Sequence, residues 1–183
     1  MILILDFGSQ YTQLIARRVR EANVYCEIHP FNFAPEKIRA MNPRGIILSG
    51  GPASLYDENA PDISDEVLNL GCPVLGICYG LYVIAQHMGG RSVGSRQREY
   101  GPATLVIDGD DALFEGLSGR EHRVWMSHGD RVEAIPGALC AIAHTDNSPT
   151  RRSRRATGAC AESSFIRKSC IRRAARKCCA TSR

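Results

Sequence analysis

The 183-residue sequence predicts an open, doubly wound α/β fold with a mostly parallel sheet and a small region of antiparallel strands. Up to about residue 90, short apolar runs alternate with segments of helical periodicity, which is typical of βαβ units whose sheet is covered on both faces. Beyond Arg91 the helical pattern ends, and apolar runs bounded by turn residues follow. The length suits one domain with enough core for a stable fold.

Each element of the α/β part follows from a local pattern. Ile2–Asp6 is an apolar run suited to a buried strand, and residues 12–22 carry apolar side chains at helical spacing. The proline that opens Pro35–Met41 favours the first turn of a short helix. Further helices are expected at residues 62–70 and from the end of the Cys78 turn through Met88. Further strands are expected before Cys78 and at residues 24–28, 45–48, 103–107, 123–126, 131–135 and 139–143.

The most specific chemical signal is the run Val74-Leu75-Gly76-Ile77-Cys78-Tyr79-Gly80. An apolar strand enters Gly-x-Cys-x-Gly and an apolar helix follows, which is the context of a nucleophile elbow with cysteine in place of serine. The glycines permit a strained turn, and the start of the helix is expected to lower the pKa of the Cys78 thiol. The alternative is a buried cysteine that acts as a small hydrophobic residue.

Three loops are expected to meet at the carboxyl edge of the sheet, where open α/β folds place their chemistry. They are residues 7–10, residues 49–52 and the turn at Cys78. Gly50 and Gly51 can turn backbone N–H groups toward a developing oxyanion, as acyl transfer requires, although a simple turn is the alternative interpretation. Phosphate binding is not expected, because the Gly-Lys-Ser/Thr of a P-loop is missing.

A second polar turn is expected in the run Trp125-Met126-Ser127-His128-Gly129-Asp130. It combines a hydroxyl, an imidazole and a carboxylate, so His128 is a candidate base for Cys78. A lone histidine in a turn more often serves as a hydrogen-bonding or surface residue. The remaining histidines have no better local context; they are His29, His87, His122 and His144.

Charge divides the sequence near residue 150. Residues 1–149 hold 12 Lys and Arg against 18 Asp and Glu, a net charge of −6, whereas residues 150–183 hold 11 against one, a net charge of +10. The eight cysteines show no CxxC spacing of metal or redox sites, and no metal site is expected. Apolar runs are too short for a membrane span, and without a leader segment a cytoplasmic protein is the default expectation.

Four segments together resemble the class I glutamine amidotransferases, most closely the amidotransferase part of GMP synthases. They are residues 5–21, 47–52, 76–80 and 124–130. The elbow and the Ser-Gly-Gly-Pro loop are shared across the superfamily, whereas the first segment and the Trp-Met-Ser-His-Gly-Asp run are specific to the GMP synthase branch. The resemblance covers residues 1–149 and implies a flavodoxin-like sheet.

The resemblance implies roles for residues of the elbow and its neighbouring loop. Cys78 would attack the side-chain amide of glutamine and form a γ-glutamyl thioester. Gly50, Gly51 and Tyr79 are expected at the oxyanion and the substrate. One position departs from the family pattern, because Tyr82 stands where the family usually has a glutamine that contacts the substrate.

The resemblance also implies partners. Ser127 and His128 match the segment that holds the glutamine main chain through backbone contacts. The glutaminase part itself would need no cofactor. Its ammonia would pass to an ATP-pyrophosphatase domain or subunit that uses ATP and Mg²⁺ to aminate XMP to GMP. The Ser-Gly-Gly-x-Asp-Ser run of that synthetase is not found in this sequence.

The family's remaining triad members, a His and a Glu in a Gly-Val-Gln-Phe-His-Pro-Glu run, are missing from the sequence. After Pro149 the composition changes instead to Arg, Ala, Cys and Ser. Residues 162–168 can be back-translated with permitted codons and then read in a frame that starts one base earlier. In that frame the codons encode Gly-Val-Gln-Phe-His-Pro-Glu, at the place where the family has this run. We therefore hypothesise that residues 150–183 are a disordered tail produced by a one-base frameshift, and that glutaminase activity is impaired.

Other interpretations stay open. A selected basic tail could bind nucleic acid, but Phe165 is the one aromatic residue of 150–183, so a stacking platform is missing and no specific nucleic-acid partner is expected. The body could be the amidotransferase subunit of another synthase, or a non-catalytic binding module. Neither a membrane nor a metal is an expected partner.

Overall fold

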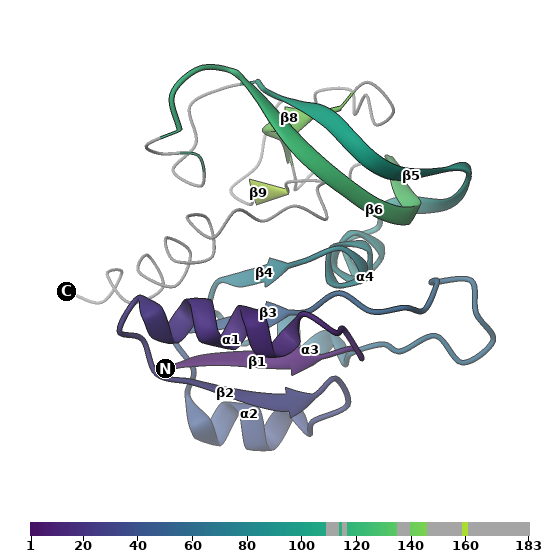
Figure 1. Ribbon diagram of the computed structural model, residues 1–183. Helices are drawn as coiled ribbons and strands as arrows, with labels where there is room; N and C mark the ends of the chain where they lie inside the picture. Colours follow the sequence, from purple (N-terminus) through teal and green to yellow (C-terminus); the bar gives the residue numbers. More distant parts are fainter. Residues whose placement is uncertain (109–113, 115–116, 135–139, 146–158, 161–183) are drawn as a thin grey trace. The chain divides into compact units, whose positions relative to one another are not determined.

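The computed structural model describes residues 1–108, 114, 117–134, 140–145 and 159–160 (Figure 1). Two compact units are distinguished, one within residues 1–83 and the other within residues 84–165. In the described part of the chain, no helix combines the length and the apolar character needed to cross a membrane.

The first unit is built on a four-stranded parallel sheet with strand order β2-β1-β3-β4. Strands and helices alternate along the chain (Figure 1). They are β1 (Ile2–Asp6), α1 (Thr12–Glu21), β2 (Cys26–Pro30), α2 (Pro35–Met41), β3 (Gly45–Leu48), α3 (Asp65–Leu68), β4 (Val74–Gly76) and α4 (Tyr79–His87). The predicted parallel α/β architecture is confirmed.

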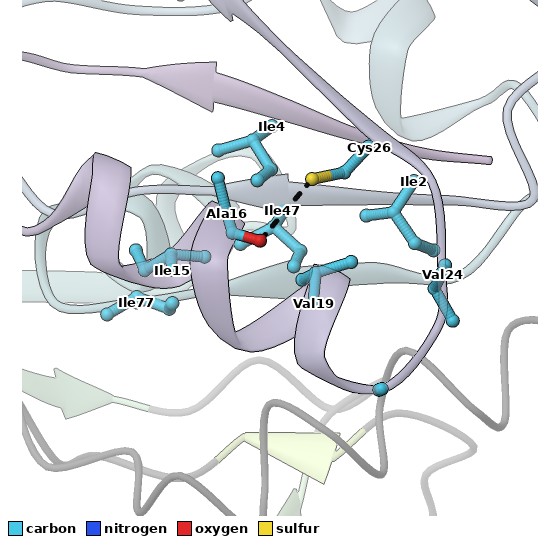
Figure 2. Packing of buried hydrophobic residues seen from close by; sticks show 10 residues of the cluster. Ile2, Ile4, Ile15, Ala16, Val19, Val24, Cys26, Ile47 and Ile77 are labelled. Atoms are coloured by element: carbon cyan, nitrogen blue, oxygen red, sulfur yellow. Dashed lines mark hydrogen bonds between the residues drawn. The ribbon is translucent and has the colours of Figure 1, made fainter.

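The central strand β1 is buried on both faces, which explains its uninterrupted apolar sequence. Ile2 and Ile4 pack against one face of α1, together with residues of β2 and β3 (Figure 2). Within this cluster the thiol of Cys26 lies 3.6 Å from the backbone oxygen of Ala16. Leu3 and Leu5 alternate with them and are also fully buried. Figure 1 shows α1 in front of the sheet and α2 and α3 behind it.

Element boundaries differ from the prediction mainly in α3. A helix was expected over residues 62–70, but α3 spans Asp65–Leu68. Its start is fixed by Ser64, whose Oγ accepts a hydrogen bond from the backbone N–H of Glu66 at 3.3 Å. Elsewhere β2 begins two residues later than expected, and α4 ends one residue earlier, at His87.

The second unit contains the predicted antiparallel strands. β5 (Arg91–Ile107) pairs with β6 (Glu121–Ala134) and with β8 (Ala143–His144), in the order β6-β5-β8. Two short strands, β7 (Cys140–Ala141) and β9 (Ala159–Cys160), pair in parallel. Its core cluster consists of Leu105, Ile107, Phe114, Val124, Ile142 and Ala143. Apart from β9, the tail hypothesised for residues 150–183 lies outside the described residues.

The long β5–β6 ribbon corrects the prediction of separate short strands. Residues 123–126 and 131–135 were expected to flank a polar turn, but β6 runs continuously from Glu121 to Ala134. Pairing with β5 continues through the expected turn, where Ser127 lies opposite Tyr100 and His128 opposite Glu99. Because β5 pairs with β6 on both sides of this segment, the polar residues remain extended. Between Gly94 and Glu99 the register shifts, because β5 has more residues than β6 between these two pairs.

Candidate active site

Cys78 occupies the turn between β4 and α4. Its φ angle is +50°, in the left-handed region that is costly for a residue with a Cβ atom. The backbone N–H groups of Leu81 and Tyr82 donate to the Cys78 oxygen at 2.9 and 3.3 Å, so the helical hydrogen bonding starts at the cysteine itself. The strained strand–turn–helix context that the sequence predicts for this residue is therefore present.

The two glycines that flank this turn are required by close backbone packing. A Cβ atom on Gly76 would lie 2.6 Å from backbone atoms of Gly80. A Cβ atom on Gly80 would lie 2.6 Å from the backbone oxygen of Leu48 in β3. The Gly80 N–H donates to the Ser49 oxygen at 3.1 Å, and the Ile77 N–H donates to the Leu48 oxygen at 2.9 Å. The elbow is thus locked against the end of the neighbouring strand.

The Cys78 thiol is held in its neutral form. Burial raises its pKa from 9.0 to about 11, which contradicts the expectation that the start of α4 would lower it. The cause is desolvation of the thiolate in the packed elbow. At pH 7 a pKa of about 11 leaves roughly one thiolate in ten thousand molecules. Chemistry at this sulfur therefore needs a base.

The loop after β3 meets the elbow as predicted. A Cβ atom on Gly50 would lie 3.4 Å from the Cβ atom of Cys78, so this glycine sits directly beside Cys78. A Cβ atom on Gly51 would lie 2.6 Å from the Phe7 backbone oxygen, which ties the loop to the segment after β1. The three loops expected at the carboxyl edge of the sheet are therefore in contact, and an oxyanion role for Gly50 and Gly51 stays a prediction.

A hydrogen-bond network at this edge was not predicted. Asp6 Oδ1 accepts from the backbone N–H groups of Gly8 and Ser9 at 3.0 and 3.3 Å, and from Thr12 Oγ1 at 2.6 Å. Ser49 Oγ accepts from the Phe7 N–H at 3.0 Å. An aspartate that ends a strand two residues before Gly-Ser is typical of an Asx-turn, so the local bonds of Asp6 could have been predicted from the sequence. The bond between Phe7 and Ser49 could not, because it spans 42 residues.

The two tyrosines near the elbow are buried. Tyr79 has 2% of its surface exposed, and its hydroxyl donates to the Pro61 oxygen at 2.6 Å. Its ring packs beside that of Phe7, with centroids 5.4 Å apart. A contact between Tyr79 and a substrate would therefore come from its backbone. Tyr82 is also buried, at 5% exposed, so it contributes to the core of the unit.

Ser127 and His128 lie on β6, in the second unit. Their side chains fall outside the described part of the structure, so their roles stay predictions. Two other histidines lie against carboxylates: His29 Nε2 is 3.1 Å from Glu27 Oε2, and His144 Nδ1 is 2.9 Å from Asp108 Oδ2. In the described ranges, no cluster of three or more His, Cys, Asp or Glu side chains could hold a metal ion.

Comparison with known families identifies this arrangement. The sequence profile of the family described as glutamine amidotransferase class-I matches residues 3–157. The chain belongs to this family. The elbow cysteine and the glycine loop beside it thus occupy the first part of a class I glutamine amidotransferase fold, and the family match covers both described units in part.

The curated relatives of this amidotransferase chain are GMP synthases (glutamine-hydrolysing). Those of Natranaerobius thermophilus and Caldanaerobacter subterraneus are 49% and 53% identical over 149 and 148 residues. The enzyme of Nitratiruptor is 55% identical over 152 residues. Each match covers 81% of this chain and 29% of the relative, so the chain spans less than a third of their length.

Solved structures share the amidotransferase fold. A chain from Thermoplasma acidophilum, described as one subunit of a GMP synthase, superposes with a TM-score of 0.73 at 26% identity. That match covers 98% of this chain and 94% of the other. A glutamine amidotransferase from Thermotoga maritima superposes with a TM-score of 0.65 at 19% identity, covering 90% of this chain and 74% of the other, and supports the fold alone.

Proposed function

We propose that this chain carries the glutaminase part of a GMP synthase. The observation that supports it most is Cys78, held at a φ of +50° between strand and helix and placed against Gly50. A non-glycine residue in this conformation persists only where surrounding packing enforces it, which is typical of catalytic nucleophiles. The GMP synthase relatives, at about half identity, favour glutamine as the substrate.

The reaction follows from the chemistry of a cysteine elbow. The Cys78 thiolate attacks the amide carbon of the glutamine side chain, and the carbonyl π electrons move to oxygen, forming an oxyanion. N–H groups of the Gly50-Gly51 loop and of Tyr79 stabilise that oxyanion. Its collapse breaks the C–N bond, the leaving nitrogen takes a proton from the protonated base and departs as ammonia, and water then hydrolyses the thioester to glutamate.

The ammonia is the product that a synthetase would use. In the proposed enzyme, a separate subunit or domain with ATP-pyrophosphatase chemistry activates XMP with ATP and Mg²⁺ and aminates it to GMP. ATP and Mg²⁺ belong to that partner, and the glutaminase reaction needs neither. Ser127 and His128 hold the main chain of glutamine through their backbone, as the resemblance implies.

We further propose that this chain is impaired as a glutaminase. With a thiol pKa of about 11, Cys78 depends on a base both to form the thiolate and to protonate the leaving nitrogen. The sequence lacks the His-Pro-Glu run that supplies this base and its orienting carboxylate in the family. Removing one member of such a unit typically costs several orders of magnitude in rate. Residues 150–183 are, in this proposal, the product of a one-base frameshift.

Two measurements test the proposal. The coding DNA is sequenced, and the neighbouring frame after codon 150 is expected to encode Gly-Val-Gln-Phe-His-Pro-Glu; absence of that run contradicts the frameshift. Glutamine hydrolysis is then assayed in the chain, in the frame-restored protein and in a frame-restored Cys78→Ala variant. Activity is expected in the restored protein alone.

Other results would favour the alternatives. The restored glutaminase activity could be stimulated by the synthetase of a different pathway and not by a GMP synthetase partner. That result would indicate that the chain is the amidotransferase subunit of another synthase. A restored protein that folds but neither hydrolyses glutamine nor forms a thioester at Cys78 would favour a non-catalytic binding module.

A further inference from the structure

Ser49 connects three segments at the carboxyl edge of the parallel sheet. Its backbone N–H donates to the Leu5 oxygen of β1 at 3.0 Å, and its backbone oxygen accepts from the Gly80 N–H of the elbow at 3.1 Å. Its hydroxyl accepts from the Phe7 N–H at 3.0 Å. The residue is completely buried. Ser49 therefore ties the end of β3 to both the segment after β1 and the elbow.

The Ser49 hydroxyl also reaches the loop that follows it. Ser49 Oγ lies 2.8 Å from the Gly50 oxygen and 3.4 Å from Asp6 Oδ1. The shorter distance favours donation of the single hydroxyl proton to Gly50, because O–H···O hydrogen bonds are usually about 2.5–3.0 Å long. The orientation of the Gly50 peptide group is therefore set by this side chain.

Gly50, which carries this peptide group, lies beside Cys78: a Cβ atom on Gly50 would be 3.4 Å from the Cβ atom of Cys78. Gly51 packs against Phe7, whose own N–H is bound by Ser49. Rotation of the peptide between Gly50 and Gly51 would redirect the N–H that follows the Gly50 carbonyl. A misplacement of about 1 Å in such a donor can cost about 100-fold in rate.

We propose that Ser49 is the positioning residue of the oxyanion loop, and that Asp6 supports it by holding the turn at residues 7–9. This inference rests on the proposed function and deepens it. Ser49 touches neither the substrate nor the sulfur. It acts through the Gly50-Gly51 peptide, whose direction matters for attack on a carbonyl carbon and not for displacement at a saturated carbon.

Two reactions of Cys78 distinguish this role. In the first, the thiolate attacks the γ-carbonyl of a glutamate γ-(4-nitrophenyl) ester, an oxyanion forms, and its collapse breaks the C–O bond and releases nitrophenolate. The leaving group needs no proton, so the full 183-residue chain can be acylated without a histidine base. In the second, the thiolate displaces iodide from iodoacetamide and no oxyanion forms. In both, the thiol proton goes to the buffer.

The experiment measures both rates at about pH 9.5 by mass spectrometry of the Cys78 peptide. Ser49→Ala is expected to slow acylation about 10-fold to 100-fold and to leave alkylation within about twofold of the parent. Thr12→Val is the matched control, because it removes a buried hydroxyl that bonds to Asp6, at 2.6 Å, and not to the Gly50-Gly51 loop. It is expected to change neither rate. Ser49→Thr, which keeps the hydroxyl, is expected to retain most of the acylation rate.

Several outcomes would overturn the proposal. Acylation of Ser49→Ala at the parental rate excludes a positioning role, and equal slowing of both reactions shows that Ser49 serves only the fold of the elbow. If Ser49→Ala does not fold, Asp6→Ala takes its place, because it removes the Oδ1 acceptor that holds the turn, with about threefold slower acylation expected; unchanged acylation there overturns the proposal. A parent chain that is alkylated but never acylated at Cys78 contradicts the proposed function itself, and the positioning role with it.

Discussion

The parallel-sheet unit and the β5–β6 ribbon present their candidate residues in different ways. In the first, the conformation of Cys78 is enforced by glycines whose close packing leaves no room for a Cβ atom, and by bonds to the end of β3. In the second, Ser127 and His128 lie inside a long antiparallel strand pair, opposite Tyr100 and Glu99. A contiguous motif can therefore specify a nucleophile through its own backbone, whereas a strand residue acquires a role only from what lies against it.

The largest expected effect tests whether steric contact enforces the elbow. Gly80→Ala would place a Cβ atom 2.6 Å from the Leu48 backbone, so we expect a loss of about 3 kcal/mol in the free energy of unfolding. Gly71→Ala is the control, since Gly71 has a φ of +77° but nothing within 4 Å; it should cost about 1 kcal/mol. Urea denaturation measures both. Equal losses would mean that contact with β3 costs no more than the strain of a positive φ, and would contradict steric enforcement of the elbow.

The next effect concerns the reactivity of the half-buried Cys78 thiol. Its pKa is raised in the folded protein, so the neutral form contributes stability that is present below pH 9 and is lost as the pH rises toward 11. At about pH 7.5 we expect iodoacetamide to modify Cys78 about 10-fold to 100-fold more slowly in the native chain than in urea, after allowing for the greater nucleophilicity of a more basic thiolate. The native rate should still increase between about pH 9 and about pH 10.5. A native rate that levels off near neutral pH would show that a cationic neighbour lowers the pKa.

A third variant separates chemistry from stability in the glycine loop. Gly50→Ala adds a methyl group at ordinary contact distance from Cys78, so unfolding should change by no more than about 1 kcal/mol while acylation slows about 10-fold. Gly51→Ala instead forces a Cβ atom to 2.6 Å from the Phe7 oxygen and should destabilise the fold by about 2 kcal/mol. Thermal unfolding and the acylation assay together distinguish the two. The same loss of stability in both variants would contradict the difference in packing.

The smallest expected effect lies in the ribbon. If Ser127 and His128 hold glutamine through their backbone, His128→Ala in the frame-restored protein should change KM and kcat by less than about threefold. Steady-state glutaminase kinetics measure this, with Ser127→Ala as the companion variant. A loss of several orders of magnitude in kcat for His128→Ala alone would instead identify that imidazole as the base, and the contrast between the two regions would fail.

Most elements of the first unit could be predicted from the sequence because each depends on a local pattern of residues. The apolar run of β1, the proline at the start of α2 and the spacing Gly-x-Cys-x-Gly each report on a few neighbouring residues, and the structure has the corresponding elements. The extent of α3 was less predictable, since a cap at Ser64 starts the helix later than expected and it ends at Leu68. Polar residues in the ribbon resembled a turn, and pairing with a distant strand kept them extended.

The sequence by itself determined the parallel α/β order, the elbow and the family, because these depend on local periodicity and on short contiguous motifs. Tertiary structure alone decided two properties of the site. The pKa of Cys78 rises because packing partly desolvates its thiol, and the Ser49 hydroxyl that bonds to the Gly50 oxygen also accepts from the Phe7 N–H, 42 residues away. Desolvation and long-range hydrogen bonds belong to the packed chain, and no local pattern of residues encodes them.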